Sequence, residues 1–421
     1  MNKVRAGYKM TELGEIPNEW KIKKLGEIAI GKGEYGIGAS ASEYVEGKPR
    51  YLRITDIGDG CKLLFNDIKG LDEKEYEKYI LKEGDIVFAR TGNTTGKGYV
   101  YNKEHGELVY AGFLIKYSVD NNIANHNFIK YVIQSKRYWD WVNIMSTRSG
   151  QPGINSNEYS SFIIQLPPLE EQEKIASILS TVDEQIDNVD ALIEKNKELK
   201  KGLMQTLLTK GIGHTRLKKT EIGEIPEKWE VSKLGQLFYI NTKSVEPSKL
   251  EEDILHYSLP AFDESRVPVK QSSIEIKSNK YLIEENSILV SKLNPRIKRI
   301  WLVNKVNFIK QICSTEFINY VAINKENVNL KYFEQYFNSD IFQQELLNRE
   351  SGSTGSRKRV TPNSTMDIKI ALPSSCEQEK IAIILSELDE KIEGYENKKQ
   401  KLEELKKGLM QQLLTGNIRV I

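Results

Sequence analysis

Residues 12–17 read Glu-Leu-Gly-Glu-Ile-Pro, and they are followed by Trp20 and by Lys-Leu-Gly at 24–26. Nearly the same block returns with every position raised by 209 (221 minus 12), as Glu-Ile-Gly-Glu-Ile-Pro at 221–226, Trp229 and Lys-Leu-Gly at 233–235. Matches of this length and in the same order indicate an internal repeat. We therefore expect a fold built from two copies of one unit.

A second set of matches closes each copy. The segment Glu-Gln-Glu-Lys-Ile-Ala at 171–176 returns at 377–382, and Lys-Lys-Gly-Leu-Met-Gln at 200–205 returns at 406–411. The stretches between these matches are far less alike. We interpret the chain as a duplication with similar ends and divergent middles.

The divergent middles still share a pattern. Residues 84–90 align with 286–292, and each segment reads as a short apolar strand that ends in a cation. Helix-like stretches follow at 127–143 and 329–345. Short β-branched and aromatic runs alternate with Gly, Asn and Asp turns, which predicts two mixed domains of the α/β (α+β) class.

Each copy ends in a stretch that reads as one long helix. The first follows Pro167 and Pro168, with Glu170, Glu171 and Glu173 favourably placed near its positive end. The second opens with Ser-Ser-Cys-Glu at 374–377, a capping-box pattern. Apolar residues then step by four and three, as Ile175, Leu179, Val182, Ile186, Val189, Ile193, Leu203 and Leu207, and as Ile381, Leu385, Leu388, Ile392, Tyr395, Leu402, Leu409 and Leu413.

This 3.5-residue period is typical of a coiled coil. At ~1.5 Å per residue each helix spans roughly 60 Å. Two such helices on one chain can pair antiparallel, which relates the two domains by an approximate twofold axis. Duplex DNA has the same kind of local dyad, so this frame suits the reading of two separated half-sites.

Polar residues interrupt both apolar stripes, at Asn196 and Lys200 in the first helix and at Lys399 and Lys406 in the second. One interpretation is that the stripe drifts onto Leu199 and Leu405, as a straight helix does against a seven-residue repeat. The other is that buried polar groups determine the register or face a partner subunit.

Bulk composition narrows the class of protein. The 421 residues suffice for two or three domains, and no apolar run approaches the ~18 residues of a membrane helix. The start has no secretory signal, and the isolated Cys61, Cys313 and Cys376 argue against a disulfide scaffold. We expect a cytoplasmic protein. The net charge of only +2 means that any claim of DNA binding must rest on local clusters.

The sequence has few patterns that are typical of a catalytic site. The four histidines are scattered without metal-ligand spacing, and neither a Walker A motif nor a nucleophile elbow occurs. The glycine-rich stretch 31–38 lacks the Gly-Lys-Ser/Thr ending of a phosphate loop, so we interpret it as a flexible loop able to approach DNA closely. We expect no catalytic residue, no metal and no cofactor in this chain.

Loops at matching positions of both copies carry the candidate DNA contacts. They are the segments 90–97 and 292–299, which follow the aligned strands, and 147–155 and 353–359 further on. Arg and Lys suit guanine and phosphate, and Asn and Gln suit adenine. The predicted contacts, with two from the glycine-rich stretch, are Lys32, Tyr35, Arg90, Thr91, Asn93, Thr94, Lys97, Arg148, Gln151, Asn155, Lys292, Asn294, Arg296, Lys298, Arg299, Ser353, Arg357, Lys358 and Arg359.

The aromatic residues are better placed in a core than on a stacking surface. Tyr-Trp-Asp-Trp at 138–141 lies in a predicted helix, and Trp20 and Trp229 recur beside the Ile-Pro turn. We expect the two repeated tryptophans to anchor the start of each domain.

The repeated motifs resemble those of a known family. The Gly-Glu-Ile-Pro-x-x-Trp openings at 14–20 and 223–229, the Leu-Pro-x-x-x-Glu-Gln-x-x-Ile segments at 166–175 and 372–381, and the Lys-Lys-Gly-Leu-Met-Gln helix ends resemble the specificity subunits of type I restriction-modification enzymes. The resemblance covers essentially the whole chain. It implies target recognition domains at 1–166 and, with a linker, at 211–372, a long conserved helix at 167–210, and a second with the tail at 373–421.

The resemblance also implies a function and partners. Each domain would bind half of a split, asymmetric double-stranded DNA target with a spacer of fixed length, and the helices would dock two methyltransferase subunits. Those subunits and the restriction subunits would carry S-adenosylmethionine, ATP and Mg, with the methylation and cleavage chemistry. The chain itself would be non-catalytic, and it lacks the methyltransferase Asn-Pro-Pro-aromatic motif.

Three alternatives follow from the same residues. A coiled-coil scaffold with two protein-binding heads would show no sequence-dependent DNA binding. An enzyme with an unrecognised nuclease or methyltransferase centre would be active alone. A related system with a fused methyltransferase-nuclease partner would need the same specificity subunit. Exposed helix surface meant for partners also predicts self-association of the isolated chain.

Overall fold

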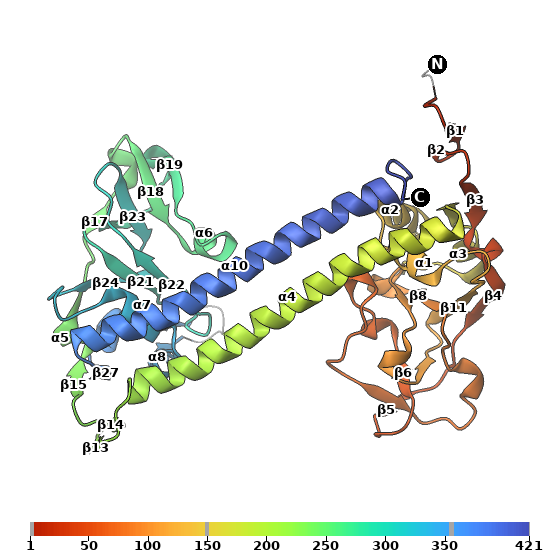
Figure 1. Ribbon diagram of the computed structural model, residues 1–421. Coiled ribbons are helices and arrows are strands. Elements are labelled where there is room, and N and C mark those ends of the chain that lie inside the picture. The colour runs from red at the N-terminus through yellow and green to blue at the C-terminus, as the bar shows by residue number, and fades with distance from the viewer. Residues whose placement is uncertain (1–3, 148–150, 353–357, 421) are drawn as a thin grey trace. The chain divides into compact units, whose positions relative to one another are not determined.

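The computed structural model describes residues 4–147, 151–352 and 358–420 (Figure 1). The chain divides into two compact units, one made of residues 1–189 and 398–421 and the other of residues 190–397. We call them unit 1 and unit 2. The two long helices, α4 (Leu169–Lys210) and α10 (Ser375–Leu413), are each cut by this division. Each helix therefore gives its first half to one unit and its second half to the other.

Unit 1 holds twelve of the described strands and three short helices besides the helix halves. The strands are β1 (Tyr8–Thr11), β2 (Gly14–Pro17), β3 (Lys21–Lys24), β4 (Ala29–Tyr35), β5 (Ala41–Glu43), β6 (Arg50–Leu52), β7 (Lys69–Leu71), β8 (Asp85–Ala89), β9 (Gly98–Val100), β10 (Leu108–Tyr110), β11 (Leu114–Val119) and β12 (Ile163–Leu166). The helices are α1 (His126–Val132), α2 (Lys136–Ser146) and α3 (Ser156–Ser160). Figure 1 shows the three helices gathered beside the first half of α4, with β5 and β6 at the opposite end of the unit.

The central sheet of unit 1 has the order β4-β11-β8-β9, with all neighbours antiparallel. Its middle strand β8 is apolar on both faces because both faces are covered. Ile86 and Phe88 belong to the core shared with α1, α2 and the start of α4, whereas Val87 and Ala89 belong to a second core on the other face. The continuous apolar run predicted as a strand is thus a strand between two cores.

Unit 2 repeats this plan with a larger second sheet. Its strands are β13 (Leu217–Thr220), β14 (Gly223–Pro226), β15 (Glu230–Lys233), β16 (Phe238–Ile240), β17 (Ser244–Val245), β18 (Asp253–Tyr257), β19 (Val269–Ser272), β20 (Lys280–Ile283), β21 (Ser287–Ser291), β22 (Ile300–Val303), β23 (Lys310–Ser314), β24 (Phe317–Ala322), β25 (Glu350–Ser351), β26 (Arg359–Val360) and β27 (Lys369–Leu372). Its helices are α5 (Leu234–Leu237), α6 (Leu259–Glu264), α7 (Leu330–Asn338), α8 (Asp340–Leu347) and α9 (Pro362–Thr365).

The sheet β16-β24-β21-β22 corresponds to the central sheet of unit 1. Ile288 and Val290 of β21 face the core that includes α7, α8 and the start of α10, and Leu289 faces the core on the other side. A five-stranded sheet, β17-β20-β23-β18-β19, contributes to this unit where unit 1 has the separate pairs β5-β7 and β6-β10. The extra strands are the main difference between the two units.

Two local expectations need correction. Each helix-like stretch of the middles is broken in two, because Ser135 and Ser339 accept hydrogen bonds from the amides of Tyr138 and Phe342 and so start new helices as N-caps. The capping box at 374–377 is only half formed. Ser374 Oγ accepts from the amide of Glu377, but the Glu377 carboxylate binds Trp229, His214 and the amide of Ile212 instead of turning back.

Repeated tryptophans anchor both units, as predicted. Trp20 and Trp229 are fully buried, and each donates its indole N–H to the carboxylate near the start of a long helix, to Glu171 and Glu377 respectively, at 2.9 Å. In unit 1 Arg419 also pairs with Glu171, at 2.7 Å. The tail after α10 therefore completes unit 1 in the way that the linker after α4 completes unit 2.

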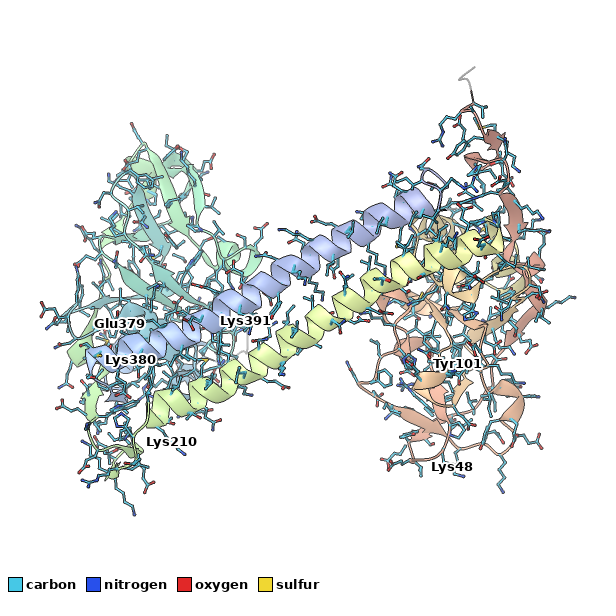
Figure 2. All side chains as sticks on the ribbon, viewed as in Figure 1. Lys48, Tyr101, Lys210, Glu379, Lys380 and Lys391 are labelled. Carbon is cyan, nitrogen blue, oxygen red and sulfur yellow. The ribbon has the colours of Figure 1, made fainter. Side chains whose placement is uncertain are left out.

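Within each unit the helix halves pair antiparallel, as the 3.5-residue period predicts. In unit 1, Ile175 and Leu179 share a core with Leu413, and Asp183, further along α4, pairs with Lys406, further back on α10. In unit 2, Lys200 pairs with Asp389 by the same pattern. Glu379, Lys380 and Lys391 on α10 and Lys210 at the end of α4 are exposed (Figure 2).

The polar positions of the apolar stripes lie in the seam, with Asn196 buried and Lys200, Lys399 and Lys406 partly buried. Asn196 is 6% exposed, whereas Leu199 and Leu405 are 51% and 50% exposed. The interpretation that the stripe drifts onto these leucines is therefore wrong. The polar residues stay in the seam because partners are available there.

Those partners connect each helix pair to a shorter helix of the same unit, α1 in unit 1 and α7 in unit 2. In junction 1 (Tyr131, Gln134, Asp183 and Lys406), Lys406 Nζ lies 2.7 Å from Asp183 Oδ1 and 3.0 Å from Gln134 Oε1, and the Tyr131 hydroxyl donates to Asp183 Oδ2 at 2.9 Å. Burial disfavours ionisation of Asp183, but Lys406 and then Lys130 outweigh it, so the pKa of Asp183 lies below its usual value.

Junction 2 (Lys200, Gln335 and Asp389) repeats this arrangement with fewer groups. Lys200 Nζ lies 2.5 Å from Asp389 Oδ1, and Gln335 of α7 donates to Asp389 Oδ2 at 2.8 Å. The Asp389 side chain is 44% exposed, against 17% for Asp183. Solvent screens the second junction more, so it contributes less to stability.

Candidate nucleic-acid interface

Two predicted loops of unit 1 meet after the end of β8. The amide of Gly92 donates to Pro152 O at 3.1 Å, the amide of Ile154 donates to Arg90 O at 2.9 Å, and Thr91 pairs with Gly153 as an isolated bridge. We call residues 90–97 and 151–156 loop cluster 1. Segments that lie about sixty residues apart in the sequence thus form one backbone-joined surface element.

Buried tyrosines hold this cluster from the core side. The Tyr138 hydroxyl donates to Gly96 O at 2.7 Å, and the Tyr159 hydroxyl donates to Ala89 O at 2.8 Å and accepts from the Gly96 amide at 3.1 Å. Gly96 has φ +91, and a Cβ there would lie 2.5 Å from Val142. The loop base is therefore rigid, and Tyr138 is a core residue as predicted, while Trp139 and Trp141 are partly buried around it.

Most of the glycine-rich stretch of unit 1 is a strand and not the flexible loop expected from its composition. Residues 29–35 form β4, which pairs with β11, and the register of this pair shifts between Lys116 and Ser118 of β11. A Cβ at Gly33 would lie 2.5 Å from the Tyr117 ring, so this glycine allows close packing. Lys32 and Tyr35 remain exposed on the strand.

The Tyr35 side chain joins β4 to loop cluster 1. Its hydroxyl accepts a hydrogen bond from the amide of Ser156 at 3.2 Å. The guanidinium carbon of Arg90 lies 4.8 Å from the centre of the Tyr35 ring. These two predicted residues, 55 positions apart in the sequence (90 minus 35), are therefore in contact.

Some of the other predicted residues of unit 1 make contacts within the protein, and others are exposed to solvent. Asn155 caps α3, since its side chain accepts from the amide of Glu158 at 3.0 Å. Lys97 pairs with Asp59 at 2.8 Å, and Thr94 has a long contact of 3.5 Å to Thr91 O. Asn93 and Gln151 are exposed.

Unit 2 builds an equivalent cluster after β21. The Lys292 amide donates to Glu316 O at 2.9 Å, the Val360 amide donates to Lys292 O at 3.0 Å, and the Asn294 amide donates to Lys358 O at 2.8 Å. We call residues 292–299 and 358–360 loop cluster 2. Lys292 occupies the backbone position that Arg90 occupies in unit 1, where the Arg90 amide donates to Phe113 O.

Five cations of loop cluster 2 are paired with carboxylates. Arg299 makes two hydrogen bonds to Asp263, at 2.6 and 2.8 Å, and lowers the pKa of Asp263. Lys298 lies 2.6 Å from Asp340. The further pairs are Arg296 with Glu350, Lys358 with Glu350, and Arg359 with Glu316. The hydrogen bond from Lys358 lowers the pKa of Glu350, and Glu316 raises the pKa of Arg359.

Pairing lowers the positive charge that this cluster presents. Arg299 is 12% exposed, which makes it a structural residue in this state. Among the described residues, Lys292 is the cation of the cluster without an ion pair. Three further predicted residues, Arg148, Ser353 and Arg357, lie outside the described residues.

Phe113 is a surface residue that the sequence did not single out. Its carbonyl accepts the Arg90 amide at 3.0 Å, and 60% of its side chain is exposed. The equivalent position of unit 2 is Glu316. Alignment of the turns before β11 and β24 could have revealed this exchange of an aromatic for a carboxylate beside the predicted loops.

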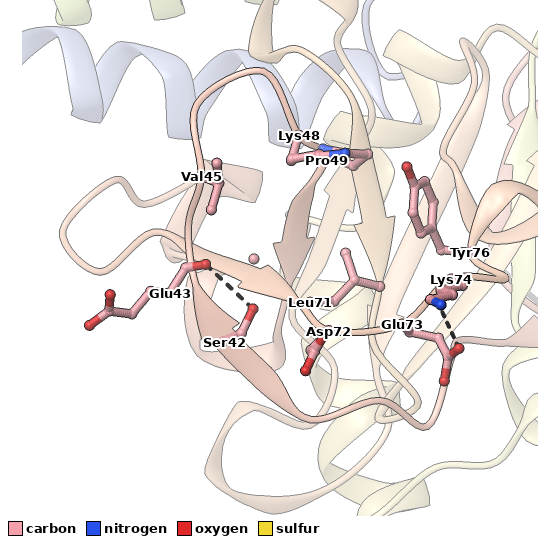
Figure 3. Close-up of a pocket in the computed structure, with 11 residues that line it drawn as sticks. Ser42, Glu43, Val45, Lys48, Pro49, Leu71, Asp72, Glu73, Lys74 and Tyr76 are labelled. Atoms are coloured by element: carbon pink, nitrogen blue, oxygen red, sulfur yellow. Dashed lines mark hydrogen bonds between the residues drawn. The ribbon is translucent and has the colours of Figure 1, made fainter.

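A separate hollow of about 690 Å³ lies beside β5 and β7 of unit 1 (Figure 3). Its charged lining consists of Glu43, Lys48, Asp72, Glu73 and Lys74, and none of the predicted contacts lines it. In the described parts of the chain, no group of three or more His, Cys, Asp or Glu side chains could hold a metal ion. A search of the same residues finds no helix that is long and apolar enough to cross a membrane.

Comparison with known proteins identifies the family. The family model described as "Type I restriction modification DNA specificity domain" matches residues 17–200 and again 226–404. A protein of Methanocaldococcus jannaschii assigned as the type I restriction enzyme MjaX specificity subunit is 31% identical over 98% of this chain and 97% of its own length. The MjaVIII specificity subunit of the same organism is 29% identical over 96% of this chain and 94% of its own.

Solved structures share the fold. The type I restriction-modification S subunit from M. genitalium superimposes with a TM-score of 0.59 at 16% identity, covering 96% of this chain and 97% of its own. A chain solved in work on complex assembly and conformational transition of the type I R-M system gives 0.54 at 17% identity, covering 96% and 99%. Two matches of the family domain, at the positions of the two repeats, explain the duplicated motifs, and the chain belongs to the specificity subunits of type I restriction-modification enzymes, the non-catalytic DNA-recognition subunits of those systems.

Proposed function

We propose that the chain reads a bipartite, asymmetric DNA target, with one half-site bound by loop cluster 1 and the other by loop cluster 2. The observation that carries this proposal is the pair of clusters itself. Both follow equivalent strands, β8 and β21, and are closed by equivalent backbone hydrogen bonds, yet their side chains differ. Equivalent position supports a shared task, and different side chains support different base sequences.

Candidate contacts are unequal within each cluster. In unit 1 the exposed Lys32, Asn93 and Gln151 and the stacked Arg90 have side chains available for DNA. In unit 2, Arg296, Lys358 and Arg359 would exchange carboxylate partners for phosphates, whereas the two hydrogen bonds from Arg299 to Asp263 support the loop. Phosphate contacts would position each unit, and base contacts would select the sequence.

We further propose that the two long helices dock two methyltransferase subunits, through which restriction subunits join the complex in the cytoplasm. Exposed charged residues such as Lys380 and Lys391 on α10 offer a polar surface for such partners. S-adenosylmethionine, ATP and Mg would bind to those partners. The target would include a spacer of fixed length between the half-sites.

Exchange of residues 17–166 for the same segment of another family member is expected to change one half of the target motif and leave the other half unchanged. The reason is that each cluster is built entirely within its own unit. The motif is measured by methylome sequencing of a host carrying the complete system. The reciprocal exchange of residues 226–372 is the matched control and should change the other half.

Three results would contradict the proposal. A change in both halves after one exchange would exclude independent reading, and a single palindromic motif would exclude an asymmetric target. Absence of any sequence-dependent footprint with the co-expressed complex would favour a scaffold whose heads bind proteins.

Substitution of Glu316 by Gln is expected to tighten binding to DNA of any sequence. It removes a carboxylate that pairs with Arg359, so the net positive charge of loop cluster 2 rises by one. The slope of log affinity against log salt concentration should steepen by about one charge. Glu326→Gln, an exposed carboxylate outside the cluster, is the control. Equal effects of both substitutions would show that only net charge matters.

A further inference from the structure

We infer that Arg90 reads a guanine in the half-site of unit 1, and that Tyr35 is the positioning residue that holds its guanidinium for this task. This inference rests on the proposed function and assigns a base contact within it. Neither composition nor spacing separates base contacts from phosphate contacts. The geometry around Arg90 does so.

The backbone of Arg90 is held on both sides. Its amide donates to Phe113 O at 3.0 Å, and its carbonyl accepts from the Ile154 amide at 2.9 Å. The next loop residues are tied to the core through Gly96, whose amide and carbonyl bind two buried tyrosine hydroxyls. The Cα–Cβ direction of Arg90 is therefore determined by two strands and a loop.

The Tyr35 ring that faces the Arg90 guanidinium is also held in place by hydrogen bonds. Tyr35 is the last residue of β4 and pairs with Ile115 of β11. Its hydroxyl accepts from the Ser156 amide at 3.2 Å, and Ser156 Oγ donates to Gly33 O at 3.0 Å. The ring cannot turn away without breaking the first bond, so it offers a preformed face 4.8 Å from the guanidinium carbon.

Within the described part of the chain, the lack of a carboxylate partner distinguishes Arg90 from most cations of loop cluster 2. No carboxylate among the described residues forms an ion pair with Arg90, whereas five cations of loop cluster 2 have such partners. Stacking on an aromatic face restrains the plane of a guanidinium but leaves its N–H donors available. Two donors in a restrained plane match the O6 and N7 acceptors of guanine, whereas a phosphate needs no such plane.

Unit 2 provides an internal comparison. Lys292 stands at the backbone position of Arg90, with the same two kinds of hydrogen bond, to Glu316 O and from the Val360 amide. A lysine is a point charge without the planar fork of arginine. We therefore expect no matching two-donor contact from Lys292.

The experiment uses the chain in complex with its methyltransferase subunits and selects bound sequences from DNA with a randomised half-site. Arg90→Lys keeps the charge and should lower the preference for guanine at one position by about 10- to 100-fold, since one bidentate pair is lost. Tyr35→Leu should weaken the same preference at the same position, and Tyr35→Phe, which keeps the ring but loses the hydrogen bond from Ser156, should have an intermediate effect. The unit 2 half of the motif serves as the internal control for folding.

Two outcomes would overturn the inference while leaving the proposed function intact. One is an unchanged motif with Arg90→Lys together with a uniform loss of affinity with Arg90→Ala, which would make Arg90 a phosphate contact. The other is a Tyr35→Leu variant that loses preference at several positions, which would make Tyr35 merely structural. If the unmodified complex selects no motif at all, the proposed function fails, and the inference fails with it.

Discussion

Replacing Trp20 with alanine is expected to lower the free energy of unfolding of unit 1 by about 3–5 kcal/mol, the range for a fully buried tryptophan. The substitution removes a large side chain from the core and also the N–H that Glu171 accepts at 2.9 Å. Glu171 is 4% exposed, so water cannot replace that donor. Denaturant unfolding measures the loss.

Two further variants separate the contributions. Trp20→Phe keeps most of the volume and loses the donor, so it should cost about 1–3 kcal/mol. Trp229→Ala is the matched change in unit 2, where the Glu377 side chain is 14% exposed and also binds His214. Hydrogen exchange should show lost protection in β12 after Trp20→Ala and in β27 after Trp229→Ala. Equal losses in both units after either change would contradict this assignment.

Substitution of Lys406 by Met is expected to destabilise the protein by about 3 kcal/mol, because it leaves the largely buried Asp183 without its main partner. Lys200→Met is the matched control, and it should cost about 1 kcal/mol or less because Asp389 is 44% exposed. Adding Asp183→Asn to Lys406→Met should recover part of the loss, since no unpaired charge then remains buried. A double variant less stable than Lys406→Met would contradict this explanation.

The loss of stability caused by Lys406→Met should become smaller as the pH falls. The pKa of Asp183 is lowered in the folded state, so the junction stabilises the protein above the unfolded value of about 3.9 and loses this contribution as the pH falls through the lower folded value. The difference in stability between the wild type and Lys406→Met should therefore be constant near neutral pH and shrink below about pH 4. A difference that grows on acidification would have the wrong sign for a paired carboxylate.

Periodic and repeated features were predictable from the sequence. The heptad positions are buried from Ile175 to Ile193, and the two tryptophans lie where the repeat indicates anchors. The polar seam positions allowed two interpretations, and the one that the sequence favoured, a drift of the stripe onto Leu199 and Leu405, is wrong. Asn196 is buried and Leu199 is exposed. The partner of Lys200, Asp389, lies on the other helix and far away in the chain.

Local residue types gave wrong predictions of backbone conformation and of hydrogen-bond partners at two places. The number of glycines at 31–38 predicts a flexible backbone. In the structure, however, Gly33 lies in a strand and is required for close packing against Tyr117. The Glu of the 374–377 capping pattern binds Trp229 instead of the helix start, because a buried indole N–H needs an acceptor. Both errors have one cause, since a tertiary partner outweighs a local preference.

The duplication, the long helices and the loops proposed as DNA contacts could be predicted from the sequence alone, because repeats, apolar periodicity and turn residues are visible in neighbouring positions of the chain. The tertiary structure was needed to show which loops are joined by hydrogen bonds. It also shows that the Arg90 guanidinium stacks on the Tyr35 ring, and that Arg299 pairs with Asp263, thirty-six positions away. Charge and hydrogen-bond pairing depend on distance in space. Pairs so far apart in the chain meet only when the strands, helices and loops that carry them have folded together.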